Sequence, residues 1–148
     1  MLWDNIKITG NVKIDVIGAD GAIKESREIK NLVVTTGKEY IASRMKDATA
    51  TAMGYMELGT GTTAAAVGDT ALQTVISGSR TALTSTTVTT NAVAYVANFP
   101  AGTGTGAVTE AGIFNAASAG TMLCRTVFAV VNKGAADAMS ITWTITVS

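Results

Sequence analysis

The segment Ile141-Thr142-Trp143-Thr144-Ile145-Thr146-Val147 alternates apolar side chains with threonines, one residue at a time. Successive side chains of a β-strand point to opposite faces, so this period of two predicts a strand with one buried face and one solvated face. We expect the apolar face, with Trp143 near its centre, to lie in a hydrophobic core. The segment thus predicts a fold that is rich in β-structure.

Strand patterns recur along most of the chain. An alternating run over 12–16 leads to Asp20-Gly21, a dipeptide typical of hairpin turns, and Gly10-Asn11 predicts an earlier turn. Apolar, β-branched or alternating runs predict further strands over residues 22–27, 29–35, 53–58, 69–77, 80–90, 91–99, 107–115 and 121–131. The predicted core contains Val93, Tyr95, Phe99, Phe128, Ile141, Trp143 and Ile145. Many short strands at this spacing favour a β-sandwich or barrel.

One helix is predicted from about Gly37 to Lys46. Thr36 and Glu39 have the spacing of a capping box, in which Thr36 caps the first turn and Glu39 bonds back to it. Helical spacing then places Tyr40, Ile41 and Met45 toward one side, where we expect them to pack on a sheet.

Length and charge bound the class of protein. The chain of 148 residues has the size of one domain, which we place at 1–148 with residues 1–5 as an N-terminal arm. Its 11 basic and 11 acidic residues cancel, so neither nucleic acid nor a membrane is an expected partner. Residues 1–47 hold 15 of these 22 charges, which leaves seven for a long region of Ala, Thr, Gly, Ser and Val.

The absence of histidine removes the commonest general base and every catalytic triad that uses it. A single cysteine, Cys124, can form neither an internal disulfide nor a four-cysteine metal site. We therefore expect no enzymatic activity, no catalytic residues, no cofactor and no metal. Cys124 lies in a predicted strand and is expected to be a small core residue.

Two short motifs resemble functional signatures. The run Gly102-Thr103-Gly104-Thr105-Gly106-Ala107 matches a dinucleotide-binding pattern by letter, but a β-like run follows where that site needs a helix, so a flexible loop is favoured. The triplet Asp69-Thr70-Ala71 is similar to the Asp-Thr-Gly of aspartic proteases, which pair two carboxylates. Alanine replaces the glycine, so a turn aspartate is favoured over a hydrolase.

Glu110 stands alone in an uncharged stretch. One interpretation is a buried carboxylate with a raised pKa. The favoured interpretation is a salt bridge or a backbone-capping role, with Arg125 as a candidate partner. In the N-terminal segment, Trp3 either folds back on its own domain or inserts into a partner. We take Leu2 and Trp3 as candidate partner-binding residues, because tryptophan is enriched at interface hot spots.

Three groups of sequence segments resemble a known protein family. The first is Asn31-Leu32-Val33-Val34-Thr35-Thr36-Gly37-Lys38-Glu39-Tyr40-Ile41-Ala42-Ser43-Arg44-Met45. The second is Glu57-Leu58-Gly59-Thr60-Gly61-Thr62-Thr63 with Gly68-Asp69-Thr70-Ala71-Leu72. The third begins with Thr109-Glu110-Ala111-Gly112-Ile113-Phe114-Asn115 and continues through 120–123, 125–128 and 142–145. Together they resemble small virion structural proteins of tailed bacteriophages, over roughly residues 31–148.

The resemblance implies a β-sandwich of jelly-roll type, with one short α-helix packed on it, that binds other virion proteins. It implies a capsid decoration, or cement, protein on the outside of the phage head, where such proteins bridge subunits of the major capsid protein. We then expect a homo-oligomer that is assembled in the host cytoplasm and resides in the virion. The alternative is a tail or tail-fibre module that binds a receptor or carbohydrate. Room for only one globular module favours the head.

Overall fold

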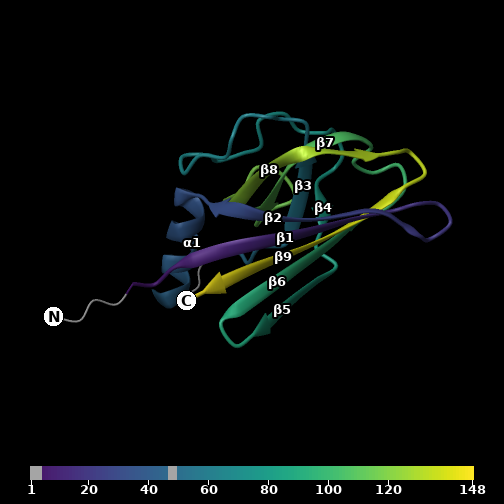
Figure 1. Cartoon of the computed structure of the whole chain (residues 1–148). Coiled ribbons are helices and arrows are strands. Elements are labelled where there is room, and N and C mark those ends of the chain that lie inside the picture. Colours follow the sequence, from purple (N-terminus) through teal and green to yellow (C-terminus); the bar gives the residue numbers. More distant parts are fainter. Residues whose placement is uncertain (1–4, 47–49) are drawn as a thin grey trace.

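A computed structural model describes residues 5–46 and 50–148 (Figure 1). Within them lie nine strands and one helix, so the chain is mainly β with one short helix, as expected. In chain order they are β1 (Ile8–Ile17), β2 (Ile23–Val33), α1 (Thr35–Lys46), β3 (Tyr55–Gly59), β4 (Thr81–Ala82), β5 (Ser85–Thr89), β6 (Ala92–Phe99), β7 (Gly106–Phe114), β8 (Met122–Lys133) and β9 (Ala138–Val147).

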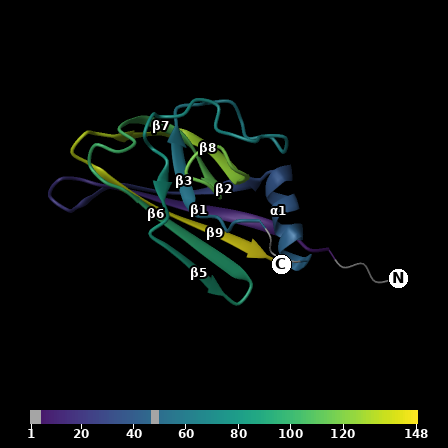
Figure 2. The ribbon, with the colours of Figure 1, turned by 180° about the vertical axis from the view of Figure 1, so that it is seen from behind.

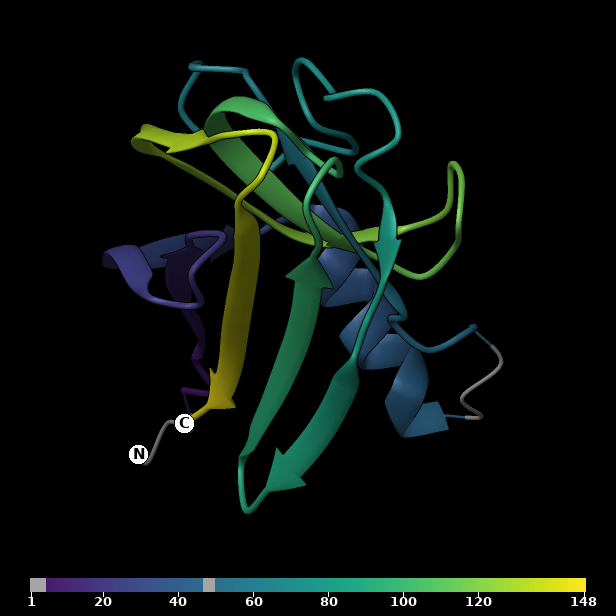
Figure 3. The ribbon, with the colours of Figure 1, turned by 90° about the vertical axis from the view of Figure 1, so that its right-hand side faces the viewer.

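The described strands form one antiparallel sheet in the order β4-β3-β7-β8-β2-β1-β9-β6-β5. One half of the sheet holds β4, β3, β7 and β8, and the other holds β2, β1, β9, β6 and β5. The junction between the two halves is narrow, because β2 and β8 pair only at Leu32 with Arg125 and at Val33 with Cys124. The strands of one half cross over those of the other, and α1 lies at one side of the curl (Figures 2 and 3). This curled sheet bears out the mainly β class, but it does not confirm a sandwich of jelly-roll type.

The first hairpin confirms the turn predicted at Asp20-Gly21. Gly21 adopts a φ of 81°, which glycine tolerates without steric cost, and the Asp20 side chain accepts a hydrogen bond from the Ala22 N–H at 3.0 Å. The turn predicted at Gly10-Asn11 is wrong, because β1 runs unbroken through it. Gly10 lies opposite Asn31, and a Cβ on Gly10 would come 1.4 Å from the Asn31 Oδ1. That glycine makes room for a neighbouring side chain.

The predicted core is confirmed for its strand residues. Trp143 and Ile141 on β9 are fully buried and Ile145 nearly so, and on β6 Tyr95 and Phe99 are buried with them. Phe128 is buried too, and Val93 packs at the margin. Residues from both halves of the sheet, such as Met56, Leu58 and Val108 from β3 and β7, complete one cluster. Cys124 is buried, as predicted.

The helix is confirmed, but its beginning and its buried side differ from the prediction. It begins at Thr35, and the Thr36 hydroxyl donates to the Met122 carbonyl at 2.9 Å, so the predicted Thr36 cap is wrong. Tyr40 and Ile41 pack on the core as expected. Met45 is 84% exposed, so its predicted packing is wrong. The helix approaches β8 most closely at Gly37, where a Cβ would come 1.9 Å from the Leu123 carbonyl oxygen.

The region between β3 and β5 holds less strand than the sequence predicted. Residues 69–77 form a loop whose β-pairing with the sheet is limited to an isolated bridge between Gly59 and Val75. The strand predicted over 80–90 is divided into β4 and β5, which pair with different strands. The glycine-rich run over 102–105 is a loop that leads directly into β7, as predicted, and Gly106 is the first residue of that strand.

Candidate functional site

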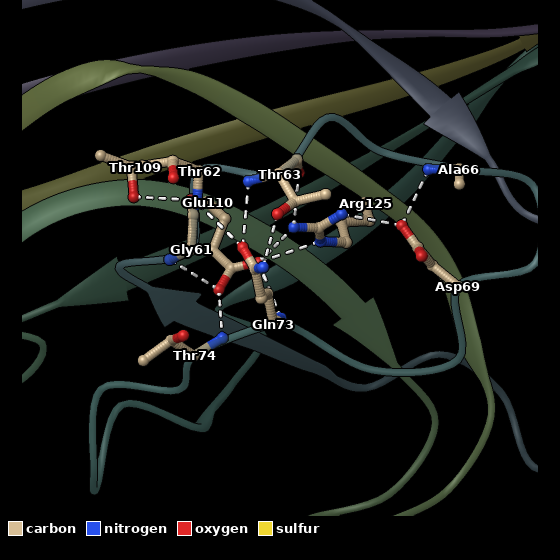
Figure 4. A network of polar contacts seen from close by, with 10 residues as sticks. All are labelled: Gly61, Thr62, Thr63, Ala66, Asp69, Gln73, Thr74, Thr109, Glu110 and Arg125. Carbon is tan, nitrogen blue, oxygen red and sulfur yellow. Dashed lines mark hydrogen bonds and ion pairs between the residues drawn. The ribbon is translucent and has the colours of Figure 1, made fainter.

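The candidate residues from the sequence fall into two groups. Leu2 and Trp3 lie outside the described residues. Asp69, Glu110 and Arg125, which lie far apart in sequence, meet in one polar network beside β7 and β8 (Figure 4). The network joins three charged side chains, and its geometry decides what these residues can do.

Glu110 and Arg125 are brought together by the pairing of β7 with β8. Arg125 lies opposite Gly112, two residues from Glu110, which makes the two side chains diagonal neighbours on one face. The Arg125 Nε donates to the Glu110 Oε2 at 2.9 Å, and its Nη2 is 2.8 Å from the same oxygen. Both side chains are buried. The salt-bridge interpretation of Glu110 is therefore confirmed.

The Glu110 carboxylate also accepts three backbone hydrogen bonds from the loop after β3. The Gly61 and Thr74 N–H groups donate to Oε1 at 2.9 and 2.7 Å, and the Gln73 N–H donates to Oε2 at 3.0 Å. A Cβ on Gly61 would come 2.5 Å from the Glu110 Oε1, so this close approach requires glycine. The predicted capping role is confirmed as well, since one carboxylate fixes two ends of a loop.

Asp69 closes the other side of the network. Its Oδ2 accepts from the Arg125 Nη1 at 2.8 Å and from the Ala66 N–H at 2.9 Å. Burial opposes ionisation of this carboxyl, but the Ala66 N–H and the Arg125 guanidinium outweigh it and hold the pKa of Asp69 below its ordinary value. The prediction of a turn aspartate is confirmed, because Asp69 bonds within its own turn.

Gln73 organises the remaining part of the loop. Its Oε1 accepts from the N–H groups of Thr62 and Thr63, both at 3.0 Å, and its Nε2 donates to the Thr63 hydroxyl. The Thr63 carbonyl in turn accepts from Arg125 at 3.0 Å. No sequence pattern singled out Gln73, because an isolated glutamine in a polar run carries no spacing signal.

The network is built as an anchor for the loop. An open hollow of about 220 Å³ lies beside it, lined by Thr63, Asp69, Gln73 and Arg125. The acid chemistry of aspartic proteases needs two carboxylates that share a proton. Here the Arg125 guanidinium bonds to both Asp69 and Glu110, so the two carboxylates are joined through a cation and not to each other. The geometry supports a structural use of these carboxylates.

Two further charged side chains, those of Arg80 and Lys133, are also bonded to partners within the fold. Arg80 forms a two-bond ion pair with Glu57 at 2.9 and 3.1 Å, and its guanidinium lies 3.7 Å from the centre of the Phe114 ring. Lys133 is buried and donates to the carbonyls of Pro100 and Asp137 at 3.0 and 2.6 Å. Its burial lowers the pKa of Lys133, although the nearby Asp137 carboxylate opposes this shift.

The seven charged side chains of residues 50–148 are thus all engaged in the fold. Asp137, the last of them, pairs with Lys24 at 2.9 Å and accepts from the Gly134 N–H. Five of the seven are buried: Glu57, Glu110, Arg125, Lys133 and Asp137. The exposed surface of this region is consequently formed mostly by uncharged residues.

Models of protein families, curated proteins and solved structures gave no match to this chain. In the described ranges, no group of three or more Cys, Asp or Glu side chains is arranged to hold a metal ion. The helix that the structure describes lacks the length and apolarity needed to cross a membrane.

Proposed function

We propose that the chain is a structural protein of a tailed-bacteriophage virion and decorates the outside of the head, where it bridges subunits of the major capsid protein. The observation that carries this proposal is the internal use of charge over 50–148. All seven charged side chains of that region are held in ion pairs or buried hydrogen bonds. A surface with so few free charges suits a large, permanent, apolar interface better than an ion-paired one.

The sequence segments that carry the family resemblance add support, because residues from them form the polar network. Two of these groups of segments supply the residues that fix one loop on the sheet, namely Gly61, Asp69, Glu110 and Arg125. A pattern that builds a loop anchor is expected of a structural family. The resemblance also implies a jelly-roll sandwich, and we keep that topology as part of the proposal, supported by the main core cluster, to which both halves of the sheet contribute.

The edge strand β5 offers a surface for such contacts. Each of its five residues, Ser85–Thr89, is exposed, and residues 81–109 contain no charge. Sheet edges in isolated proteins are usually protected by charges, prolines or bulges. An unprotected edge is in keeping with a protein that associates, as homo-oligomer and with the capsid, and that resides in the virion.

The number of copies of the protein per virion distinguishes a head decoration protein from a tail component. Quantitative gel analysis of purified virions should give hundreds of copies per particle for a decoration protein, whereas tens or fewer would favour the alternative of a tail or tail-fibre module. Heads that lack the protein should rebind it, and binding should persist at about 1 M salt because screening leaves apolar contacts intact. Collapse of binding at high salt would contradict the apolar interface.

The β5 edge can be tested with a matched pair of variants. Thr87→Lys places a charge on the exposed β5 edge, and Asn11→Lys places one on an exposed position of β1, in the charged half of the sequence. We expect the Thr87 variant to bind heads more weakly and the Asn11 variant to bind like the parent protein. Equal binding of both would remove β5 from the interface.

We also propose that the protein catalyses no reaction, since Asp69, Glu110 and Arg125 are occupied by one another and by the loop. Peptide hydrolysis at acidic pH that disappears in a folded Asp69→Asn variant would overturn this part of the proposal.

A further inference from the structure

The strand β5 lies at one end of the sheet, with backbone groups directed away from it (Figure 1). The Val147 N–H donates to the Asn91 carbonyl at 2.9 Å, so Asn91 and every second residue after it in β6 direct their backbone groups toward β9. The residues between them face β5, where they lie opposite Ser85, Thr87 and Thr89. Thr86 and Val88 therefore direct their N–H and C=O groups outward, and these groups meet no hydrogen-bond partner in the described part of the chain.

Charge distinguishes the β5 edge from the open part of β2. Because β2 pairs with β8 at two positions only, residues 23–30 have an open edge, and they carry five charged side chains. Charges on an edge strand discourage pairing with another chain. In contrast, β5 lies in the uncharged run 81–109, and each of its five residues is exposed. The β5 edge thus lacks this protection.

A charged residue lies on the inner side of β5. Arg44 of α1 lines a groove there together with Thr86 and Val88. Its guanidinium donates to the Ala50 carbonyl at 2.9 Å and lies 5.8 Å from the centre of the Tyr40 ring. The alternate side chains of β5 project from the opposite, outer face of the sheet. The positive charge is therefore engaged by its own chain, and the outer face of β5 is neutral.

We propose that β5 pairs antiparallel with β5 of a second copy of this chain, about a two-fold axis at Thr87. In this register Thr86 lies opposite Val88 of the second copy, and Val88 lies opposite its Thr86. The outward N–H and C=O groups of each pair then bond to each other, which is the pattern of an antiparallel ladder. Closed dimers with two-fold symmetry are also the commonest homo-oligomers.

The symmetry of the edge favours a second copy over an unrelated partner. The outward backbone groups are placed symmetrically about Thr87, so the strand is its own complement, and no like charges meet when two copies pair. Pairing also covers Val88, which is 70% exposed. Two paired strands of five residues bury less than the about 1,200 Å² of typical stable interfaces. We therefore expect a weak dimer whose population rises with protein concentration.

Cysteine substitutions test the position of the axis. Residues opposite each other in a pair without mutual hydrogen bonds have Cα atoms about 4.5 Å apart, which a disulfide can span. Under mild oxidation, Thr87→Cys should form a linked dimer at least about tenfold faster than Thr89→Cys, whose two copies would lie roughly 13 Å apart along the strands. A mixture of Ser85→Cys and Thr89→Cys should crosslink, because these positions face each other. Cys124 is buried and stays out of the reaction.

A proline at the edge tests the hydrogen bonds. Thr86→Pro removes an outward N–H and leaves the bonds of β5 to β6 in place. The dimer then loses two backbone hydrogen bonds, so its dissociation constant in sedimentation should rise by about tenfold. Glu28→Pro is the matched control. Glu28 lies opposite Lys13, whose backbone groups face β9, so its N–H also points away from the neighbouring strand. It should leave the dissociation constant unchanged.

The inference is overturned if the parent protein sediments as a monomer at millimolar concentration, or if folded Thr87→Cys crosslinks no faster than Thr89→Cys. Circular dichroism checks the fold of each variant, and the cysteine pair decides the question should Thr86→Pro fail to fold. The inference rests on the homo-oligomer of the proposed function, but its test uses isolated protein. A β5 dimer that does not rebind heads would refute head decoration alone, and a monomer that rebinds heads would refute the inference alone.

Discussion

The Arg125 Nε lies 2.9 Å from the Glu110 Oε2, and both side chains are buried where β7 pairs with β8. Removing one member of such a pair leaves a charge in the interior, which typically costs about 3–5 kcal/mol. We expect Arg125→Met and Glu110→Gln each to lower the free energy of unfolding by about 3 kcal/mol, and the double variant to cost less than the sum. Urea denaturation of the four proteins measures this coupling.

Lys13→Met is the control for these variants. Lys13 is more than half exposed and lies 3.9 Å from Asp15, so its loss should change the stability by less than about 1 kcal/mol. Strict additivity of the Arg125 and Glu110 variants would mean that the two residues act separately.

Asp69 makes the stability depend on pH at the acidic end. Its pKa is lower in the folded protein than in the unfolded chain, so the unfolded chain takes up the proton more readily. The contribution of Asp69 is complete above the unfolded pKa of about 3.9 and is lost as the pH falls through the lower folded pKa. We expect Asp69→Asn to be less stable than the parent at pH 7, with the difference shrinking as the pH falls below about 4. A difference that does not change with pH would contradict this role.

Gly37 separates the preference of a helix from the demands of tertiary packing. In an isolated helix, Gly→Ala is stabilising by about 1 kcal/mol. Here the new Cβ would come 1.9 Å from the Leu123 carbonyl oxygen, so α1 must move away from β8. We expect Gly37→Ala to destabilise the protein by about 1–3 kcal/mol in thermal or urea unfolding. Gly68→Ala, where a Cβ meets nothing within 4 Å, is the control and should be close to neutral.

Thr90 carries backbone strain at the turn between β5 and β6. Its φ is 51°, in the left-handed region where a β-branched residue is an outlier. Thr90→Gly should stabilise the protein by up to about 1 kcal/mol, because glycine enters this region without the steric cost. By contrast, Thr87→Gly in the strand should destabilise it by about 0.5–1 kcal/mol. A loss of stability on Thr90→Gly would show that the threonine side chain matters more than its backbone angle.

Trp143 contributes volume to the core at the cost of an unpaired donor. Its Nε1 is buried and meets no hydrogen-bond acceptor among the described residues. Trp143→Ala should cost about 3–5 kcal/mol, the usual range for an emptied aromatic site. Trp143→Phe should cost clearly less, because it keeps much of the ring and removes the unpaired N–H. Equal losses for the two variants would show that the N–H is satisfied in solution, and a loss below about 1 kcal/mol for Trp143→Ala would remove it from the core.

Part of the candidate site was visible in the sequence. Glu110 and Arg125 stand out as charges in uncharged strands, and a buried charge needs a partner. Gln73 and the backbone N–H groups of Gly61 and Thr74 gave no such signal, because their role depends on where a long loop returns to the sheet. Lys133 was also missed, since its acceptors are backbone carbonyls, which every residue carries. Leu2 and Trp3 remain predictions.

The sequence by itself determined most of the strands and the first hairpin. The alternation over 141–147 and the Asp20-Gly21 turn act through pleat geometry and backbone conformation, which are local properties of a few residues. Only the tertiary structure decided that Gly10 lies within a strand, that Met45 faces solvent, and that 69–77 is a loop. Each of these outcomes depends on a segment distant in sequence: the Asn31 side chain over Gly10, the contact of Gly37 with Leu123, and the Glu110 carboxylate beneath the loop. Such contacts form when the chain closes on itself, and they override the local pattern because an overlap of atoms or an unpaired buried charge costs more than a strand or cap preference gains.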